Sequence, residues 1–210
     1  MRLLVVVATD KEADALGCTK AQVCVSGIGR TNAAAATTAA LLEEGPFDGV
    51  ISVGIAGALP GSMLRPGEIV VATECVYVEE GLRTPQGFQD TAAMGFPLGD
   101  FEGNRVPCEA RLTRFVPGPR HDGVIATVAT CSGTDALAAE VQARTGALAE
   151  AMEGAAVVHA ARRLGIAGGE VRVISNSTGD RDRQQWDIAR AFAAMHVLGE
   201  RIETLARRSG

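Results

Sequence analysis

Short apolar runs rich in valine and isoleucine recur along the chain, and turn residues or polar stretches separate them. Runs of this length, bounded by glycine or charged residues, are typical of strands buried inside a sheet. We expect such strands at residues 3–8, 21–26, 49–58, 68–79, 123–130 and 170–177. The run at 68–79 is long enough for one strand or two short ones.

The stretches between these runs have the composition or the periodicity of helices. Residues 31–44 are rich in alanine and end at Gly45-Pro46, which indicates a helix with a defined stop. The last stretch repeats apolar residues close to the 3.6-residue period, at Ile188, Phe192, Met195, Leu198 and Ile202. We expect helices at 31–44, 135–144, 153–164 and 183–207. The alternation of strands and helices predicts an α/β fold whose mostly parallel sheet is covered on both faces.

Residues 81–120 interrupt this alternation, because they are dense in glycine, proline and charge. The pattern predicts a long loop. Loops of that length in a compact domain are usually functional, so we expect a lid or a contact between subunits.

Composition narrows the class of protein. The chain has 210 residues and no linker-like segment, so we expect one domain spanning 1–210. Hydrophobic residues make up 47% and charged residues 21%, as in soluble globular proteins. The net charge of -5 argues against nucleic acid or an anionic membrane as partner. No signal-peptide pattern and no membrane-spanning run is present, which favours a cytoplasmic location.

The residues that usually hold metals or dinucleotides do not form the required patterns. The five cysteines show no CxxC spacing, and the three histidines stand apart from other ligand residues, so we expect free thiols and no metal site. Gly27-Ile28-Gly29 lies between a strand and a helix, but Asn32 stands where the dinucleotide motif needs a third small residue. We therefore expect no cofactor.

Two glutamates are candidates for chemistry. Glu12 follows the first strand, where it is either a solvated acid in a helical first turn or a carboxylate at the ligand-binding edge of the sheet. Glu153 opens a predicted helix beside Met152. A carboxylate there can accept hydrogen bonds from both hydroxyls of a ribose while the methionine packs on the sugar, although a simple N-terminal helix acid is the alternative.

A polar group also follows the last predicted strand. Asn176 ends that strand after Ser175, and its amide suits the edge of a base, although an asparagine that merely stops a strand is common. The polar run Asp180-Arg181-Asp182-Arg183 comes next. Trp186, the single tryptophan, either covers a bound ring or anchors the last helix.

Six motifs in order resemble the nucleoside phosphorylase/nucleosidase superfamily, and within it the methylthioadenosine/adenosylhomocysteine nucleosidase branch. Each motif alone is weak, whereas their order along nearly the whole chain is specific. They are the opening strand with Glu12, Ser26-Gly27-Ile28-Gly29-Arg30, Gly54-Ile55-Ala56-Gly57, Arg65-Pro66-Gly67-Glu68-Ile69-Val70-Val71, Met152-Glu153-Gly154-Ala155-Ala156, and Arg172-Val173-Ile174-Ser175-Asn176.

The resemblance implies a fold, an activity and a set of site residues. The fold would be a single phosphorylase/hydrolase-like domain with a central mixed, mostly parallel sheet flanked by helices, in a homo-oligomer (dimer or tetramer) without a cofactor. The activity would be cleavage of the N-glycosidic bond of a small nucleoside. The implied catalytic residues are Glu12 and Arg172, which hold and activate the attacking water, and Asn176 at the base; the implied substrate-binding residues are Met152, Glu153, Ser175, Ala56, Gly57 and Asp182, with Arg181 as an alternative to Asp182.

Two positions depart from the nucleosidase branch. Those enzymes carry Asp where Asn176 stands and commonly Ser where Ile55 stands. Together with Asp180-Arg181-Asp182-Arg183 and Trp186-Asp187, these departures resemble the futalosine hydrolases, which release hypoxanthine from futalosine in menaquinone biosynthesis. An amide can donate to N7 or O6 of a 6-oxopurine but can also pair with adenine, so the substrate preference rests on the resemblance. A methylthioadenosine nucleosidase, a purine nucleoside phosphorylase and an inactive nucleoside-binding protein remain as alternatives.

Overall fold

The computed structural model describes residues 1–18, 21–116 and 118–207. Its strands are β1 (Leu3–Val7), β2 (Gln22–Val25), β3 (Gly49–Ala58), β4 (Ile69–Tyr77), β5 (Gly81–Thr84), β6 (Gly87–Asp90), β7 (Arg105–Pro107), β8 (His121–Thr127), β9 (Ala149–Ala151) and β10 (Gly168–Ser177). Its helices are α1 (Asp10–Leu16), α2 (Arg30–Glu43), α3 (Asp135–Thr145), α4 (Gly154–Arg163) and α5 (Ile188–Arg207), with 3-10 turns η1 (Ala110–Thr113) and η2 (Arg181–Arg183).

Strand β3 is the centre of the main sheet. It runs parallel to β1 and to β10, and its last residues, Gly57 and Ala58, pair antiparallel with β9. Since β10 also pairs with β4, and β4 continues through β8 to β9, the five strands β3, β10, β4, β8 and β9 close into a ring, with β1 and β2 extending from it. The closure brings the ends of β3, β9 and β10 to the same place.

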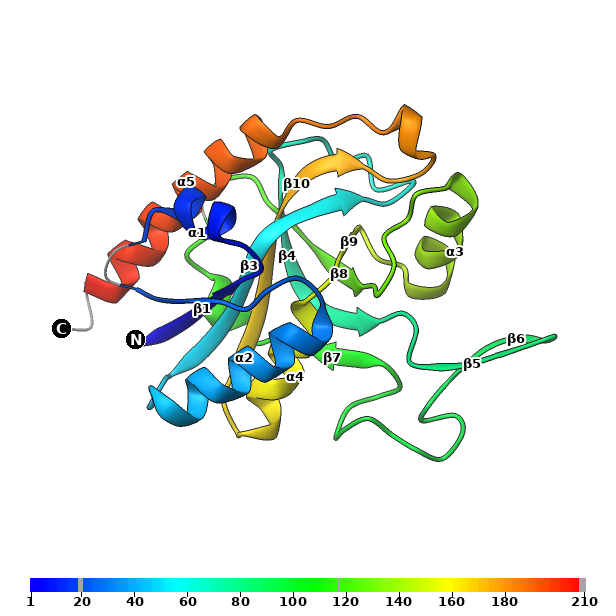
Figure 1. Cartoon of the computed structure of the whole chain (residues 1–210), viewed down its shortest axis with the longest axis horizontal. Helices are drawn as coiled ribbons and strands as arrows, with labels where there is room; N and C mark the ends of the chain where they lie inside the picture. The colour runs from blue at the N-terminus through cyan, green and yellow to red at the C-terminus, as the bar shows by residue number, and fades with distance from the viewer. Residues whose placement is uncertain (19–20, 117, 208–210) are drawn as a thin grey trace.

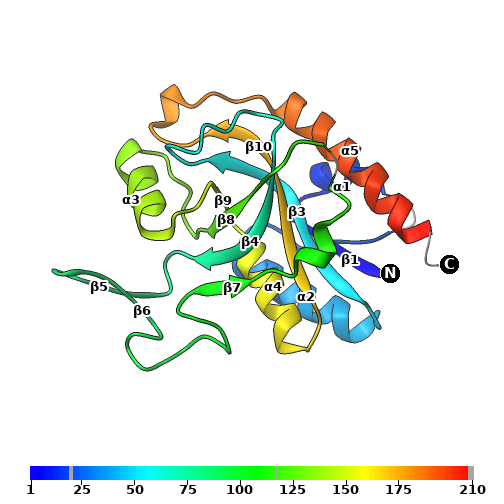
Figure 2. The ribbon, with the colours of Figure 1, turned by 180° about the vertical axis from the view of Figure 1, so that it is seen from behind.

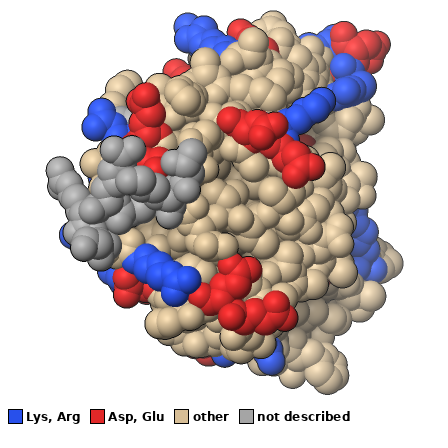
Figure 3. Space-filling view, turned by 60° about the vertical axis from the view of Figure 1, so that its left-hand side comes forward, with Lys and Arg blue, Asp and Glu red and all other residues tan. Residues whose placement is uncertain are grey.

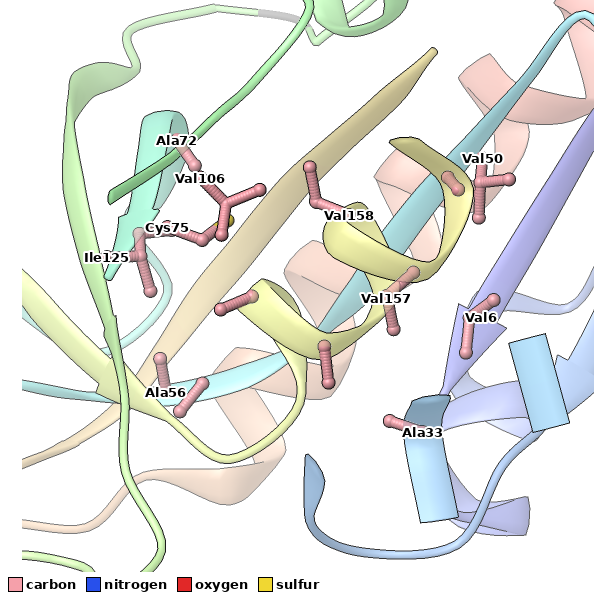
Figure 4. Packing of buried hydrophobic residues seen from close by; sticks show 14 of the residues in the cluster. Val6, Ala33, Val50, Ala56, Ala72, Cys75, Val106, Ile125, Val157 and Val158 are labelled. Atoms are coloured by element: carbon pink, nitrogen blue, oxygen red, sulfur yellow. The ribbon is translucent and has the colours of Figure 1, made fainter. Parts of the chain in front are cut away.

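Helices cover both faces of this sheet. Figures 1 and 2 show α1 and α5 along one side and α2 and α4 along the opposite side, while α3 lies near the ends of β8 and β9. Small side chains let α4 lie close to both α2 and the sheet; in Figure 4, Val157 and Val158 lie among Ala33 of α2, Val6 of β1 and Val50 of β3. The structure is thus a single mixed α/β domain with a mostly parallel central sheet, as the sequence predicts.

The predicted strands and helices are found close to their expected positions, except at the start of the last helix. The sequence pattern missed α1 and the short strand β9, whose Ala-Glu-Ala sequence has low strand propensity. The last helix was predicted to begin at residue 183, which is wrong: it begins at Ile188. Residues 185–187 instead run along the end of β10, where Gln185 O accepts from Ser177 N–H and Asp187 N–H donates to Ser175 O. Asp187 Oδ1 then accepts from Arg190 N–H and caps the helix.

The segment 81–120 is not the continuous loop that its composition predicts. Strands β5 and β6 form a hairpin that extends away from the body of the molecule (Figure 1). Strand β7 joins the main sheet beside β4, and Cys108 N–H donates to Thr73 O just beyond it. A role as lid or subunit contact stays a prediction.

Charged residues of both signs share the surface. On the face in Figure 3, Lys and Arg residues stand beside Asp and Glu residues, with uncharged surface between them. Arginines pair locally with acids, as Arg30 does with Glu79 and Glu80. Within the described part of the chain, no helix is both long and apolar enough to cross a bilayer.

Candidate active site

A pocket of about 780 Å³ lies at the carboxyl ends of β1, β3 and β10. Ligands of α/β sheets bind at this edge, because the loops that leave parallel strands meet there. Its lining includes residues at or just after these strand ends, residues of β9, and the two residues between β9 and α4: Ala8, Thr9 and Glu12; Ile55, Ala56 and Gly57; Glu150, Ala151, Met152 and Glu153; Ser175 and Asn176.

Glu12 is buried rather than solvated, with 4% of its surface exposed. It sits in the first turn of α1 and forms a capping box with Thr9. Its Oε2 accepts from Ala8 N–H (3.0 Å), Thr9 N–H (3.1 Å) and the Thr9 hydroxyl (3.1 Å), and its Oε1 accepts from Ile55 N–H (3.0 Å). Because Oε1 has a single such donor, it retains capacity to accept a hydrogen bond from a ligand or water.

Arg172 lies behind the pocket wall, fully buried. Its Nε donates to Glu170 Oε1 (2.7 Å), and its Nη2 donates to Ser52 Oγ (3.0 Å) and Glu153 Oε2 (3.3 Å). Burial alone would lower the pKa of the guanidinium, but Glu170, Glu153 and Glu12 together raise it above its ordinary value. One arginine therefore connects the carboxylates of the site electrostatically.

Gly54 makes the approach of Glu12 and Arg172 possible. A Cβ at this position would lie 2.5 Å from Arg172 Nη1 and 2.5 Å from Glu12 Oε1, closer than real Cβ contacts. The glycine of the Gly54-Ile55-Ala56-Gly57 motif is thus explained by space for the two side chains.

Glu153 is the residue immediately before α4, and it is also buried. Its Oε2 accepts from Arg172, and its Oε1 accepts from Gly29 N–H (3.0 Å), which belongs to the turn between β2 and α2. The Gly27-Ile28-Gly29 turn therefore orients a carboxylate by its backbone. Beside it, Met152 lines the pocket.

A β-bulge orients Asn176. Ile174 pairs with Ala56 and Asn176 pairs with Gly57, so Ser175 is the extra residue that redirects the end of β10. Asn176 Oδ1 accepts from Ser175 Oγ (2.7 Å), and its Nδ2 donates to Ser177 O (2.8 Å). The second hydrogen of the NH₂ group has no partner among the described residues and is available to a ligand in the pocket.

Polar groups of two other segments complete the wall near Asn176. Glu150 accepts from Ser132 N–H (2.7 Å) and from Ser132 Oγ (2.6 Å), while burial raises the pKa of its carboxyl group. Arg181 lies over the Trp186 ring at 4.8 Å, and Gln184 bridges both residues through its Oε1. Trp186 lines the pocket and forms an isolated β-bridge with Asn176, and whether it covers a bound ring stays a prediction.

The structure brings together most of the residues that the sequence pointed to. The pocket is lined by Glu12, Met152, Glu153, Ser175, Asn176, Ala56 and Gly57. From behind the wall, Arg172 donates to Glu153 and interacts electrostatically with Glu12. Asp182 is the exception: it is exposed on η2 and outside the lining, whereas its neighbour Arg181 is part of it.

Sequence reasoning missed several polar groups of the site. Thr9, Ser132 and Glu150 have no motif of their own and are recognised only by their contacts. Glu170 had a usable pattern, since it lies two residues before Arg172 in a strand and so shares its face. No group of three or more His, Cys, Asp or Glu within the described ranges is arranged to hold a metal ion.

Comparison with known proteins identifies the family of this chain. The model of the phosphorylase superfamily matches residues 15–209, a match that begins just after Glu12. A futalosine hydrolase of Streptomyces coelicolor is 38% identical over 81% of this chain and 73% of the relative, and one of Thermus thermophilus is 36% identical over 88% and 81%.

Solved structures agree on the fold. A 5′-methylthioadenosine/S-adenosylhomocysteine nucleosidase of Neisseria meningitidis superposes with a TM-score of 0.76 at 21% identity, covering 97% of this chain and 100% of the other. A futalosine hydrolase of Helicobacter pylori superposes with a TM-score of 0.76 at 17% identity, covering 98% and 97%. At these identities the structures establish the fold alone. The superfamily match and the more similar relatives show that the chain belongs to the phosphorylase superfamily, in the family that includes the futalosine hydrolases.

Proposed function

We propose that the protein is an N-glycosyl hydrolase that cleaves futalosine into hypoxanthine and dehypoxanthinyl futalosine, in menaquinone biosynthesis. One observation carries the proposal: Glu12, Glu153 and Asn176, which are distant in sequence, line a single pocket. The relatives of 36–40% identity are futalosine hydrolases, which favours this substrate over other nucleosides.

The two glutamates are assigned different parts of the reaction. Glu153, held by Gly29 and Arg172, accepts hydrogen bonds from the ribose hydroxyls while Met152 packs on the sugar. Glu12 takes a proton from water through Oε1 as the water attacks the anomeric carbon. The bond between that carbon and the purine nitrogen breaks as the sugar passes through an oxocarbenium-like transition state. The electron pair leaves with the purine, and the purine anion takes up a proton from solvent. Arg172 sits behind both acids, donates to Glu153 and places its positive charge beside Glu12.

Asn176 serves the leaving base. Its uncommitted N–H donates to N7 or O6 of the 6-oxopurine, where negative charge accumulates as the bond breaks. Ser175 holds the amide in this orientation, because its hydroxyl donates to Oδ1. The pocket volume lies in the upper half of the range for ligand sites, and its apolar side chains, Ile28, Ile188 and Phe192, suit the substituent on the 5′ carbon.

The proposal extends to the assembly state and the cellular location of the protein. We expect a homo-oligomer, a dimer or tetramer, in the cytoplasm, with the extended β5–β6 hairpin and its exposed Leu82 as one contact region. Light scattering of the purified protein measures the assembly state.

A single assay tests the activity. The protein is incubated with futalosine, inosine or methylthioadenosine, each with and without phosphate, and the free base and sugar product are identified by chromatography and mass spectrometry. We expect hypoxanthine and a free sugar from futalosine, at a rate that does not depend on phosphate. A sugar phosphate would identify a phosphorylase, and adenine release from methylthioadenosine as the faster reaction would identify the other nucleosidase.

The amide at residue 176 provides a test of base recognition. Asn176→Asp is expected to shift the preference from 6-oxo towards 6-amino purines, because a carboxylic acid can protonate N7 and its carboxylate can accept from the amino group. The ratio of kcat/KM for futalosine and methylthioadenosine measures the shift. An unchanged ratio would move base recognition to other groups of the wall, such as Glu150.

A further inference from the structure

Glu170 is a fully buried acid that the proposed reaction does not use and that does not line the pocket. It lies on β10 two residues before Arg172, so both side chains leave the strand on the same face. Its Oε1 accepts from Arg172 Nε at 2.7 Å, the shortest of the three hydrogen bonds that Arg172 donates. Burying a carboxylate costs free energy unless it is paired and hydrogen-bonded, so the presence of Glu170 in the core requires an explanation.

The second oxygen of Glu170 is engaged as well. The Cys75 thiol donates to Oε2 at 2.8 Å, and Cys108 lies 3.4 Å from the Cys75 sulfur. Burial raises the pKa of Cys75 well above its usual range, so the group remains a thiol and keeps its donor hydrogen. Figure 4 places Cys75 among Ala72, Val106 and Ile125, in the core rather than at the surface. Both oxygens of the carboxylate are therefore fixed.

Gly154 leaves room for the Glu170 carboxylate. A Cβ on Gly154 would lie 2.0 to 2.1 Å from the carboxylate atoms of Glu170. Its backbone has no positive φ, and glycine in a helix costs about 1 kcal/mol relative to alanine, so conformation does not explain the residue. The reason is space: the Glu170 carboxylate occupies the position that a Cβ on residue 154 would take.

We propose that Glu170 is a positioning residue for the cleavage reaction: it fixes the Arg172 guanidinium between Glu12 and Glu153, and Gly154 is glycine to make room for it. The inference rests on the proposed function for its catalytic consequence. With Nε held by Glu170 and Nη2 by Ser52 and Glu153, Nη1 is left beside Gly54 and Glu12. Without Glu170, the buried Nε–H loses its partner, and the guanidinium turns towards the Glu12 oxygen that the attacking water needs.

The test uses complementary changes of volume. Gly154→Ala alone is expected to lower Tm, because its methyl group overlaps Glu170. Adding Glu170→Val replaces the carboxylate by a shorter side chain and removes the overlap, so the double variant should recover part of this loss of Tm. The unpaired Arg172 Nε–H accounts for the remainder. Its kcat for futalosine should nevertheless fall about a hundredfold, the effect of a misplaced catalytic group. KM should change by less than about fivefold, since Gly29 N–H still holds Glu153.

Glu170→Gln is the conservative control. Its amide oxygen still accepts from Arg172 Nε, and its NH₂ group faces the sulfur of Cys75, so kcat should stay within about fivefold of the parent protein. A spectroscopic readout is independent of activity: the Arg172 Nε–H should resist exchange with solvent in the parent and in Glu170→Gln, and should exchange faster in the double variant.

The outcomes separate this inference from the proposed function. If the double variant recovers Tm and keeps kcat within about threefold of the parent, or if its Arg172 Nε–H remains protected, positioning by Glu170 is refuted. If the parent protein releases no hypoxanthine from futalosine, the proposed function fails, while the Tm and exchange measurements still decide whether Glu170 fixes Arg172. A double variant that stays as unstable as Gly154→Ala would refute the explanation of Gly154.

Discussion

Glu12→Gln is expected to lower the turnover of futalosine at least about a hundredfold while the substrate still binds. An amide cannot take the proton from water, whereas the proposed ribose contacts of Glu153 and base contacts of Asn176 are unchanged. Single-turnover rates and the dissociation constant of futalosine, measured separately, check both halves of the expectation.

The hydrogen-bond donors around Glu12 indicate how the substitution affects folding stability. Every group that hydrogen-bonds its carboxylate is a donor, so the NH₂ of glutamine must face at least one N–H. It is best accommodated at Oε1, where only Ile55 N–H is lost, at a cost of roughly 1–3 kcal/mol of folding stability. Glu79→Gln is the matched control, because Glu79 also accepts from a backbone N–H, that of Ala129, but lies outside the pocket lining. Near-normal turnover of Glu12→Gln would remove Glu12 from the mechanism.

The fold was accessible from the sequence where hydrophobic pattern and secondary structure coincide. Strand β3 was expected at its observed bounds, because ten consecutive apolar or small residues are buried on both faces. Strand β9 was not, since three residues carry no detectable period, and its pairing with β3 and β8 comes from the closed sheet. The start of α5 was misplaced because residues 185–187 bond to β10, a tertiary contact that overrides local pattern.

The site shows the same division. Sequence alone left Glu12 open between a solvated and a functional acid, because the Ile55 N–H that holds it comes from 43 residues away. Motif order brought Glu12, Glu153 and Asn176 together, and the pocket contains all three. Asp182 was chosen for its polar neighbours, yet the direction of η2 leaves it exposed. Glu170 was overlooked because it stands in an apolar run, although its spacing from Arg172 was informative.

A shared arginine gives the site its organisation. Arg172 stands among three acids, Glu12 of α1, Glu153 before α4 and Glu170 of β10. Each acid also accepts a hydrogen bond from at least one donor other than Arg172. The acids therefore remain oriented without a ligand. The glycines at 54 and 154 leave the space in which these side chains meet.

Gly54→Ala is expected to lower kcat on the order of a hundredfold, by displacing both Glu12 and Arg172. Its methyl group would lie 2.5 Å from each of them. Both clashes involve the far ends of side chains, so the backbone of β3 need not move. Each end is nevertheless held by hydrogen bonds that the displacement breaks, and we expect a loss of about 1–3 kcal/mol of folding stability.

Gly169→Ala separates this effect from a general cost of alanine in a buried strand. A Cβ at Gly169 on β10 meets Thr113 and Leu112 only at ordinary contact distances, from 3.4 Å, and the residue is outside the pocket lining. Its kcat should therefore stay close to that of the parent protein. Kinetics with futalosine and thermal unfolding of both variants give the comparison. If Gly54→Ala lowers Tm but leaves kcat unchanged, the close approach of Glu12 and Arg172 serves folding alone, and Arg172 has no part in activating the water.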